Sequence, residues 1–178
     1  WEYAAKGPII GSPVLEAGAV YFTSDEGKLF ARDAATGEAK WSFQAKNKVW
    51  STPTVYGGVV YVGGTDKRLY ALDTADGRKL WEFDAGGAIA SRPLVADGTI
   101  YFGTFAKRFY AVDARTGQQK WVFDTQHWFW NDAVYADGTV YVGSLGGSFY
   151  ALDARTGAAK WSFAANAPIR SAPVLVGG

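Results

Sequence analysis

Two residue types that often do nucleophilic, acid–base or metal chemistry are scarce in this 178-residue chain: it has one histidine, His127, and no cysteine. Without cysteine, thiol catalysis, disulfides and cysteine-bound metals are excluded. The sequence pairs His127 with no Ser, Cys or metal ligand, and a lone histidine is more often incidental. The pair Asn131–Asp132 offers two oxygen donors, whereas calcium usually takes about six to eight. We therefore expect no catalytic, cofactor-binding or metal-binding residues here.

The composition is typical of an all-β protein that does not bind nucleic acid. Lys and Arg total 18 against 17 for Asp and Glu, a net charge of +1, whereas polyanion binding needs clustered positive charge. Aromatic residues form 16% of the chain and Gly occurs 22 times, which favours short strands joined by tight turns. No apolar run reaches the length of a transmembrane segment. The chain has no signal segment and begins with Trp1, so we expect it to be part of a longer gene product.

A strict 40-residue repeat runs through the whole chain. Tryptophan recurs at this spacing from Trp1 onward, and no insertion interrupts four copies. Residues at the same position of successive copies form what we call a column. The repeated motif comprises three columns: Asp33, Asp73, Asp113 and Asp153; Gly37, Gly77, Gly117 and Gly157; and Trp41, Trp81, Trp121 and Trp161. Such self-similarity predicts a repeat architecture, in which a residue found in every copy serves packing rather than a single site.

Each repeat contains four strand-like runs, which in one copy cover 49–55, 59–62, 69–72 and 80–83. The runs are almost continuously apolar, which indicates sheets covered on both faces. Four antiparallel strands in about 40 residues predict a β-propeller blade, whereas the alternative, a β-solenoid, lacks such regular hairpins. The chain is therefore expected to be a single, partial all-β propeller over 1–178. Its blades are expected at about 9–45, 49–85, 89–125 and 129–165.

The two ends of the chain are expected to contribute one extra strand each. Residues 1–4 match a fourth strand without its first three, and residues 169–176 match a first strand with nothing after it. Together they cannot make a fifth blade. We therefore interpret the chain as roughly half of a ring of about eight blades, with a closed four-bladed ring as the alternative.

The segments 31–41, 71–81, 111–121 and 151–161 share the pattern A-x-D-x-x-T-G-x-x-x-W, with Asp76 in place of the usual Thr as the only departure. In this pattern the Asp suits an Asx-type turn, the Gly a left-handed residue, and the Trp a large surface packed on the next blade. It resembles the tryptophan-docking repeat of the PQQ-like, or quinoprotein-type, propellers over essentially the full chain. That family includes eight-bladed PQQ-dependent alcohol dehydrogenases. It also includes non-enzymatic members, such as a propeller lipoprotein of outer-membrane assembly and sensor domains of bacterial kinases.

Function is expected where the repeat is broken. Trp50 and Trp130 occupy one column of the first strand, which by analogy with propellers is innermost, and residues 126–132 depart most from the repeat. The candidate partner-binding residues are Trp50, Arg92, His127, Trp128, Trp130, Asp132 and Arg170. Exposed Trp and Arg are typical contact residues. Additional rings that fill a blade junction are the alternative explanation.

We interpret the chain as a non-enzymatic scaffold that binds a protein or an extended peptide. The resemblance implies a location in the cell envelope, periplasmic or extracellular. Two alternatives remain open. One is half of a PQQ- and calcium-dependent dehydrogenase, although many of those enzymes stack the cofactor on two adjacent cysteines, which this chain lacks. The other is an architectural or sensor segment of a larger assembly. Unpaired edge strands are also expected to promote association.

Overall fold

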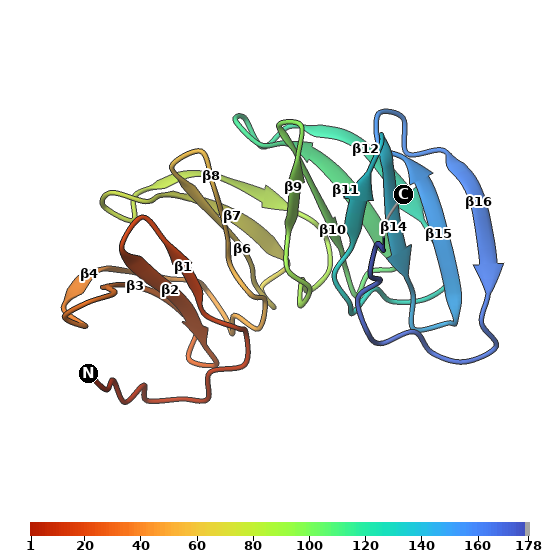
Figure 1. Cartoon of the computed structure of the whole chain (residues 1–178). Coiled ribbons are helices and arrows are strands. Elements are labelled where there is room, and N and C mark those ends of the chain that lie inside the picture. The colour runs from red at the N-terminus through yellow and green to blue at the C-terminus, as the bar shows by residue number, and fades with distance from the viewer. Residues whose placement is uncertain (177–178) are drawn as a thin grey trace. The chain divides into compact units, whose positions relative to one another are not determined.

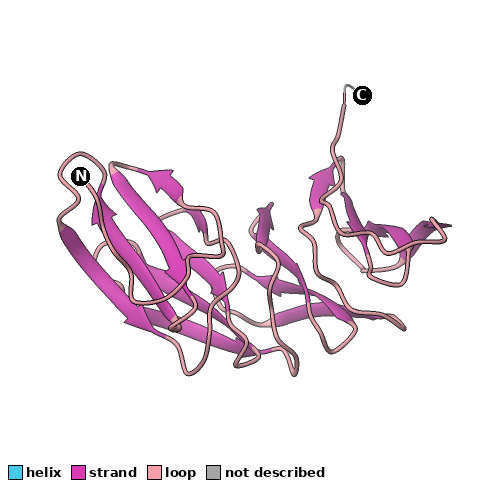
Figure 2. Ribbon diagram, turned by 90° about the horizontal axis from the view of Figure 1, so that it is seen from below, coloured by secondary structure: helices cyan, strands magenta, loops and turns pink. Residues whose placement is uncertain are grey.

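The computed structural model describes residues 1–176. Within them there are sixteen strands and no helices. The strands form four antiparallel sheets, each with its four strands in chain order (Figures 1 and 2). We call these sheets blades 1 to 4. The chain divides into two compact units, residues 1–90 with blades 1 and 2, and the part from residue 91 onward with blades 3 and 4.

In the first unit, blade 1 comprises β1 (Val14–Glu16), β2 (Ala19–Ser24), β3 (Lys28–Asp33) and β4 (Ala39–Gln44), and blade 2 comprises β5 (Thr54–Tyr56), β6 (Val59–Gly63), β7 (Arg68–Asp73) and β8 (Lys79–Asp84). In the second unit, blade 3 comprises β9 (Leu94–Ala96), β10 (Thr99–Gly103), β11 (Arg108–Asp113) and β12 (Gln119–Asp124), and blade 4 comprises β13 (Val134–Ala136), β14 (Thr139–Gly143), β15 (Ser148–Asp153) and β16 (Ala159–Ala164). The all-β fold of four-stranded blades is thus confirmed.

The two middle strands of each blade carry most of the core. Most of their side chains are buried, which explains their nearly continuous apolar sequence. In the first unit, Leu29 of blade 1 meets Val60 and Leu72 of blade 2 in one fully buried cluster. In the second unit, Phe109 and Val140 belong to the corresponding cluster.

The turn between the third and fourth strands has the hydrogen bonding that the sequence predicts. In blade 1, Asp33 Oδ1 accepts from the backbone N–H groups of Ala35 and Thr36, both at 2.9 Å. Gly37 closes the turn with φ +74°, a left-handed conformation open to glycine. Asp76 also fits this turn, because its carboxylate accepts from the backbone N–H of Arg78 at 2.9 Å, as the usual Thr hydroxyl would.

Tryptophans of the repeat pack on the glycine of a neighbouring turn. Trp41 lies against Gly77, so closely that a Cβ on that glycine would be 2.5 Å from the ring, and its indole N–H donates to the Thr74 carbonyl at 2.8 Å. In the second unit Trp121 packs on Gly157 in the same way. Within each unit, a repeat tryptophan thus packs on the turn of the next blade.

The structure corrects three expected strand positions. The first strand of blade 2 was expected over 49–55 but covers only Thr54–Tyr56, because Pro53 cannot donate to a ladder and the preceding residues lack a strand partner. Trp50 and Trp130 therefore lie on connecting segments rather than on innermost strands. Neither 1–4 nor 169–176 forms a strand, since neither segment pairs with a sheet among the described residues.

Candidate protein-binding surface

The connection between blades and the tip between second and third strands meet at the same end of a blade. In the first unit, the Thr65 N–H of one tip donates to the carbonyl of Lys48, on the connection, at 2.8 Å. In the second unit, the Leu145 N–H donates to the carbonyl of Trp128 at 2.9 Å. This end of the blades, which we call the tip surface, therefore combines two kinds of loop held by backbone hydrogen bonds.

The connection before blade 4 alternates its side chains like a strand. Phe129 points inward and is completely buried, with its ring centroid 5.3 Å from that of Phe109. It packs so closely on Gly103 that a Cβ there would be 2.1 Å from the Phe129 Cβ. This buried anchor fixes the backbone and turns its two neighbours, Trp128 and Trp130, outward.

Trp128 and Trp130 form an exposed aromatic cluster with Phe105, from the tip between β10 and β11. Phe105 stacks with Trp128 at a centroid distance of 5.3 Å and with Trp130 at 5.4 Å, and both pairs are within 17° of parallel. The tryptophans nevertheless remain 49% and 46% exposed. Stacked rings that stay open to solvent present a large, rigid apolar surface. We call these three residues the aromatic cluster.

Sequence reasoning missed Phe105, although a signal was available. The equivalent tip residues in the other copies are Asp25, Thr65 and Leu145, so Phe105 is the only ring in its column. Its importance depends on contact with a connection more than twenty residues later. A column-by-column comparison of the tips would have identified it.

Trp50 differs from Trp130 although both occupy one column of the repeat. Its indole N–H donates to Asp25 Oδ1 at 2.6 Å, and Lys48 Nζ is 2.7 Å from the other oxygen of that carboxylate. The hydrogen bonds from Lys48 and Trp50 lower the pKa of Asp25 below its usual value. Trp50 is half-buried and held in this polar contact, so it offers less free apolar surface than Trp130.

The Asp132 side chain is hydrogen-bonded to the backbone of Arg92. The Arg92 N–H donates to Asp132 Oδ1 at 2.7 Å, joining the segments that precede blades 3 and 4. The first unit has the equivalent bond, from the Ser12 N–H to Thr52 Oγ1 at 3.0 Å. Asp132 thus fills a structural position that recurs in the repeat, while the Arg92 side chain remains exposed.

His127 and Arg170 are also exposed. The His127 ring lies over Gly146, where a Cβ would be 1.9 Å from its Cδ2, so the glycine tip of blade 4 makes room for it. Arg170 lies on the segment that follows β16. The structure thus brings Trp128 and Trp130 into one cluster, and joins Arg92 with Asp132.

Comparison with known proteins identifies the family. The family model described as outer membrane protein assembly factor BamB matches residues 1–122 and 123–178. The chain belongs to the BamB family. A search of curated proteins finds no match.

Solved structures agree with the BamB-family fold. BamB from Moraxella catarrhalis is similar over 90% of this chain, with 24% identity and a TM-score of 0.80. A quinohemoprotein alcohol dehydrogenase from Comamonas testosteroni is similar over 91% with 21% identity and a TM-score of 0.80, and the designed protein Ika8 over 89% with 14% identity and a TM-score of 0.79. The chain spans 51%, 35% and 50% of their respective lengths. These likenesses show the fold, and a larger ring is consistent with them.

The dehydrogenase likeness raises the question of a PQQ and calcium site in this BamB-family chain. Asn131 is buried, its Nδ2 donates to the Ser171 carbonyl at 2.9 Å, and its Oδ1 has no partner in the described residues. Asp132 next to it already accepts a backbone hydrogen bond. No group of three or more His, Cys, Asp or Glu within residues 1–176 could hold a metal ion. These residues do not fit the oxygen-rich shell that calcium requires.

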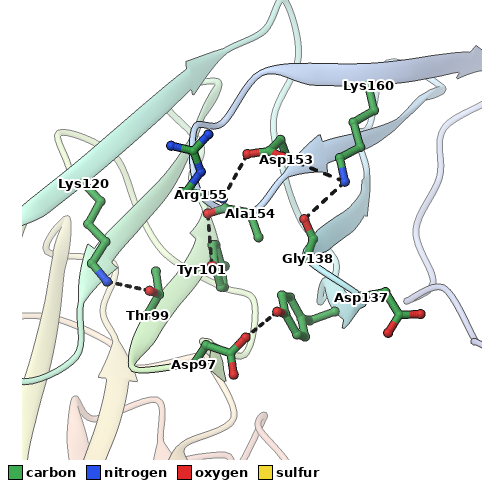
Figure 3. Close-up of a pocket in the computed structure, with 11 residues that line it drawn as sticks. Asp97, Thr99, Tyr101, Lys120, Asp137, Gly138, Asp153, Ala154, Arg155 and Lys160 are labelled. Atoms are coloured by element: carbon green, nitrogen blue, oxygen red, sulfur yellow. Dashed lines mark hydrogen bonds and ion pairs between the residues drawn. The ribbon is translucent and has the colours of Figure 1, made fainter.

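The opposite end of blades 3 and 4 contains a polar pocket of about 530 Å³ (Figure 3). Its hydroxyl groups link the blades: Tyr135 donates to Asp97 across the pocket, and the Tyr101 hydroxyl donates to the Ala154 carbonyl at 3.1 Å. Lys120 donates to the hydroxyl of Thr99 on its own blade at 2.7 Å (Figure 3). Because these groups bond one another, we interpret the pocket as part of the packing between blades 3 and 4.

Proposed function

We propose that this BamB-family chain is a non-enzymatic propeller scaffold of the cell envelope that binds a protein or an extended peptide through the aromatic cluster. The observation that carries the proposal is the stacking of Phe105 with two tryptophans that remain about half exposed. The family supports a scaffold role in outer-membrane assembly and an envelope location. No helix among residues 1–176 has the length and apolar character needed to span a membrane.

The cluster has the physical properties of a binding hot spot. Tryptophan contributes more than most residues to contact energy because it buries a large surface with few rotatable bonds. Here the rings are also preorganised: Phe105 stacks with both, and the buried Phe129 fixes the backbone between them. A partner would therefore lose little free energy to the ordering of these side chains.

The test compares two exposed-aromatic variants in the full-length protein. Trp128→Ala with Trp130→Ala removes both tryptophans, and Tyr56→Ala is the matched control, because Tyr56 is 51% exposed at the β5–β6 turn, away from the tips. Proteins captured from envelope extract are quantified by mass spectrometry, and affinity is then measured with the purified partner.

We expect the double variant to weaken binding about thirtyfold or more, as loss of a hot spot does. Tyr56→Ala should bind like the wild type. Both variants should unfold cooperatively at a midpoint close to that of the wild type, which separates a binding defect from a folding defect. An unchanged affinity in the correctly folded double variant would refute the proposal.

A further inference from the structure

The aromatic cluster leaves the indole N–H groups of both its tryptophans without an acceptor. Neither Trp128 nor Trp130 donates from its ring to any residue that the structure describes, and both rings are about half exposed. In the free protein, water can accept these hydrogen bonds. A partner that covers the rings removes this water, so it must supply acceptors of its own or leave the two donors unpaired at a cost in free energy.

The first unit shows what an indole N–H at this position of the repeat binds. Trp50, in the same column as Trp130, donates to Asp25 Oδ1 at 2.6 Å, and Lys48 Nζ lies 2.7 Å from Asp25 Oδ2. In the second unit, this aspartate and this lysine are replaced by two rings of the aromatic cluster, Phe105 and Trp128. A ring stack thus stands where the first unit has an ion pair, and the carboxylate that would accept from the remaining tryptophan is absent.

The backbone beside the cluster lacks acceptors in the same way. In the first unit, Asp66 Oδ2 accepts from the Lys46 N–H at 3.0 Å and so joins the tip of blade 2 to the connection before it. The equivalent of Asp66 in blade 4 is Gly146, which has no side chain, and the Gln126 N–H has no acceptor within residues 1–176. Two further N–H groups there are also unpaired, those of His127 and Trp128. Successive backbone N–H groups of this kind attract anions.

The charges around these donors also favour an acidic partner. Lys107, on the tip of blade 3, is exposed and forms no ion pair within the described residues. The Thr125 hydroxyl lies 3.1 Å from the Lys107 carbonyl and 2.8 Å from the His127 carbonyl, so it holds this tip beside the connection. The nearest carboxylates along the connection already have partners: Asp124 is in an ion pair at 3.0 Å, and Asp132 accepts a backbone N–H at 2.7 Å.

We propose that the partner is an acidic, extended protein segment that packs an apolar side chain on the aromatic cluster and supplies the carboxylate that Asp25 supplies in the first unit. The inference rests on the binding function proposed above and names the chemistry of the partner. One carboxylate accepts from the Trp130 indole N–H, and the backbone N–H groups of residues 126–128 bind a further acceptor along the segment. Hydrogen bonds to an ionised carboxylate are stronger than neutral ones, and Lys107 adds attraction through the solvent.

The test measures binding of synthetic peptides to the full-length protein by fluorescence anisotropy. The peptides share a central pair of leucines and differ in their flanking residues, which are glutamate, glutamine or lysine. We expect the glutamate peptide to bind about tenfold more tightly than the glutamine peptide at low salt, and the lysine peptide to bind most weakly. The preference for glutamate should narrow as salt is added, because the charge of Lys107 is exposed to solvent.

Two substitutions separate the hydrogen bond from the stacking and the charge. Trp130→Phe keeps an aromatic ring but removes the indole N–H, so it should weaken binding of the glutamate peptide about tenfold and leave the glutamine peptide nearly unchanged. Lys107→Gln should reduce the salt dependence of glutamate-peptide binding. Lys67→Gln is the matched control and should change neither peptide. Lys67 is exposed in the same column as Lys107 and has a similar left-handed backbone, with φ +72° against +66°.

Equal affinities for the three peptides, no binding of the glutamate peptide, or an equal loss of both peptides in Trp130→Phe would each overturn the proposal. If the three affinities are equal and Trp128→Ala with Trp130→Ala abolishes binding, the cluster recognises apolar segments without a carboxylate, and the proposed function stands while this inference fails. Vesicles of phosphatidylglycerol test a membrane as the occupant. Vesicle binding that Trp130→Phe leaves unchanged, without binding of the glutamate peptide, would assign the cluster to a membrane surface instead.

Discussion

Tryptophan has two different roles in this chain, and the residues around each tryptophan determine which role it has. Trp121 is buried because the glycine of the next turn leaves room for its ring and a carbonyl accepts its N–H. Trp130 stacks with Phe105 at a loop tip and keeps almost half its surface exposed. The first arrangement stabilises a blade junction, and the second leaves apolar surface available to a partner.

Replacing these two tryptophans should therefore affect different quantities. We expect Trp121→Ala to lower the free energy of unfolding by about 3–5 kcal/mol, the usual cost of removing a large buried aromatic side chain. Trp130→Ala should lower it by much less, because much of that ring already faces water. Denaturant melts of both variants provide the measurement. An equally large loss for Trp130→Ala would mean that the aromatic cluster fills a blade junction.

The docking glycines provide a second prediction at this scale. Gly157 and Gly138 have similar left-handed backbones, with φ of +76° and +69°, so alanine strains both by about 1–2 kcal/mol. Only at Gly157 would the new Cβ collide with the Trp121 ring; at Gly138 it meets open space. Gly157→Ala should therefore cost about 1–3 kcal/mol more than Gly138→Ala in urea unfolding. Equal costs would show that the ring moves aside freely.

The 40-residue register predicted much of this residue-level picture. It separated the docking tryptophans from Trp128 and Trp130, because a side chain present in every copy serves the scaffold. It did not distinguish Trp50 from Trp130, which share a column. That difference depends on the facing tip residue, Asp25 in one case and Phe105 in the other. The contact joins loops that a one-dimensional pattern does not place together.

At the scale of elements, the turn between third and fourth strands depends on an ionised aspartate. Hydrogen bonds from the Thr156 hydroxyl and backbone lower the pKa of Asp153 below its usual value. Asp113 is similar, with Thr116, and the backbone of Thr36 makes the largest contribution at Asp33. A carboxyl whose pKa is lower in the folded than in the unfolded state stabilises the fold while it is ionised.

Stability should consequently fall in acid. The contribution of Asp153 is fully present above its unfolded pKa of about 4 and is lost as pH falls through the lower folded value. Asp153→Asn keeps an oxygen acceptor but cannot titrate. Its urea midpoint should therefore change less between pH 5 and pH 3 than the wild-type midpoint, and the difference should be the effect of one titrating group. Asp137→Asn, outside these turns, controls for the lost charge. Identical pH profiles for Asp153→Asn and wild type would contradict this role.

Strand positions were predictable to the extent that apolar runs and turns mark them. The second, third and fourth strands match the expected runs, because each is bounded by a turn with a recognisable sequence. The first strand was overestimated, because Val49 and Trp50 are apolar without belonging to a strand. Val49 is buried without belonging to a sheet, so burial alone does not identify a strand.

For the whole molecule, each unit has its own core and repeats one structural plan. A repeat with near-identical copies leaves few positions free to build an asymmetric site, since most side chains are committed to blade contacts. Residues 126–132 depart most from the repeat. Within them, Trp128 and Trp130 belong to the aromatic cluster, and the adjacent pair Asn131–Asp132 supplies oxygen atoms. The choice between a scaffold and a dehydrogenase fragment therefore concerns the same short segment.

The two functions predict different responses to PQQ and calcium. Ser51 is the blade 2 equivalent of Asn131. Its hydroxyl donates to the Gly63 carbonyl at 3.0 Å and accepts from the N–H of Gly63 at 2.8 Å, so in blade 2 this position secures the connection to its own blade. We interpret Asn131 as a variant of that structural contact.

Titration of the chain with PQQ and calcium at micromolar concentration should produce no saturable change in absorbance or tryptophan fluorescence. A quinohemoprotein dehydrogenase stripped of cofactor is the positive control, and Asn131→Ser, which restores the residue of the repeat, should behave like the wild type. A stoichiometric complex that forms with the wild type and is lost in Asn131→Ser would assign this segment to a cofactor site and overturn the scaffold proposal.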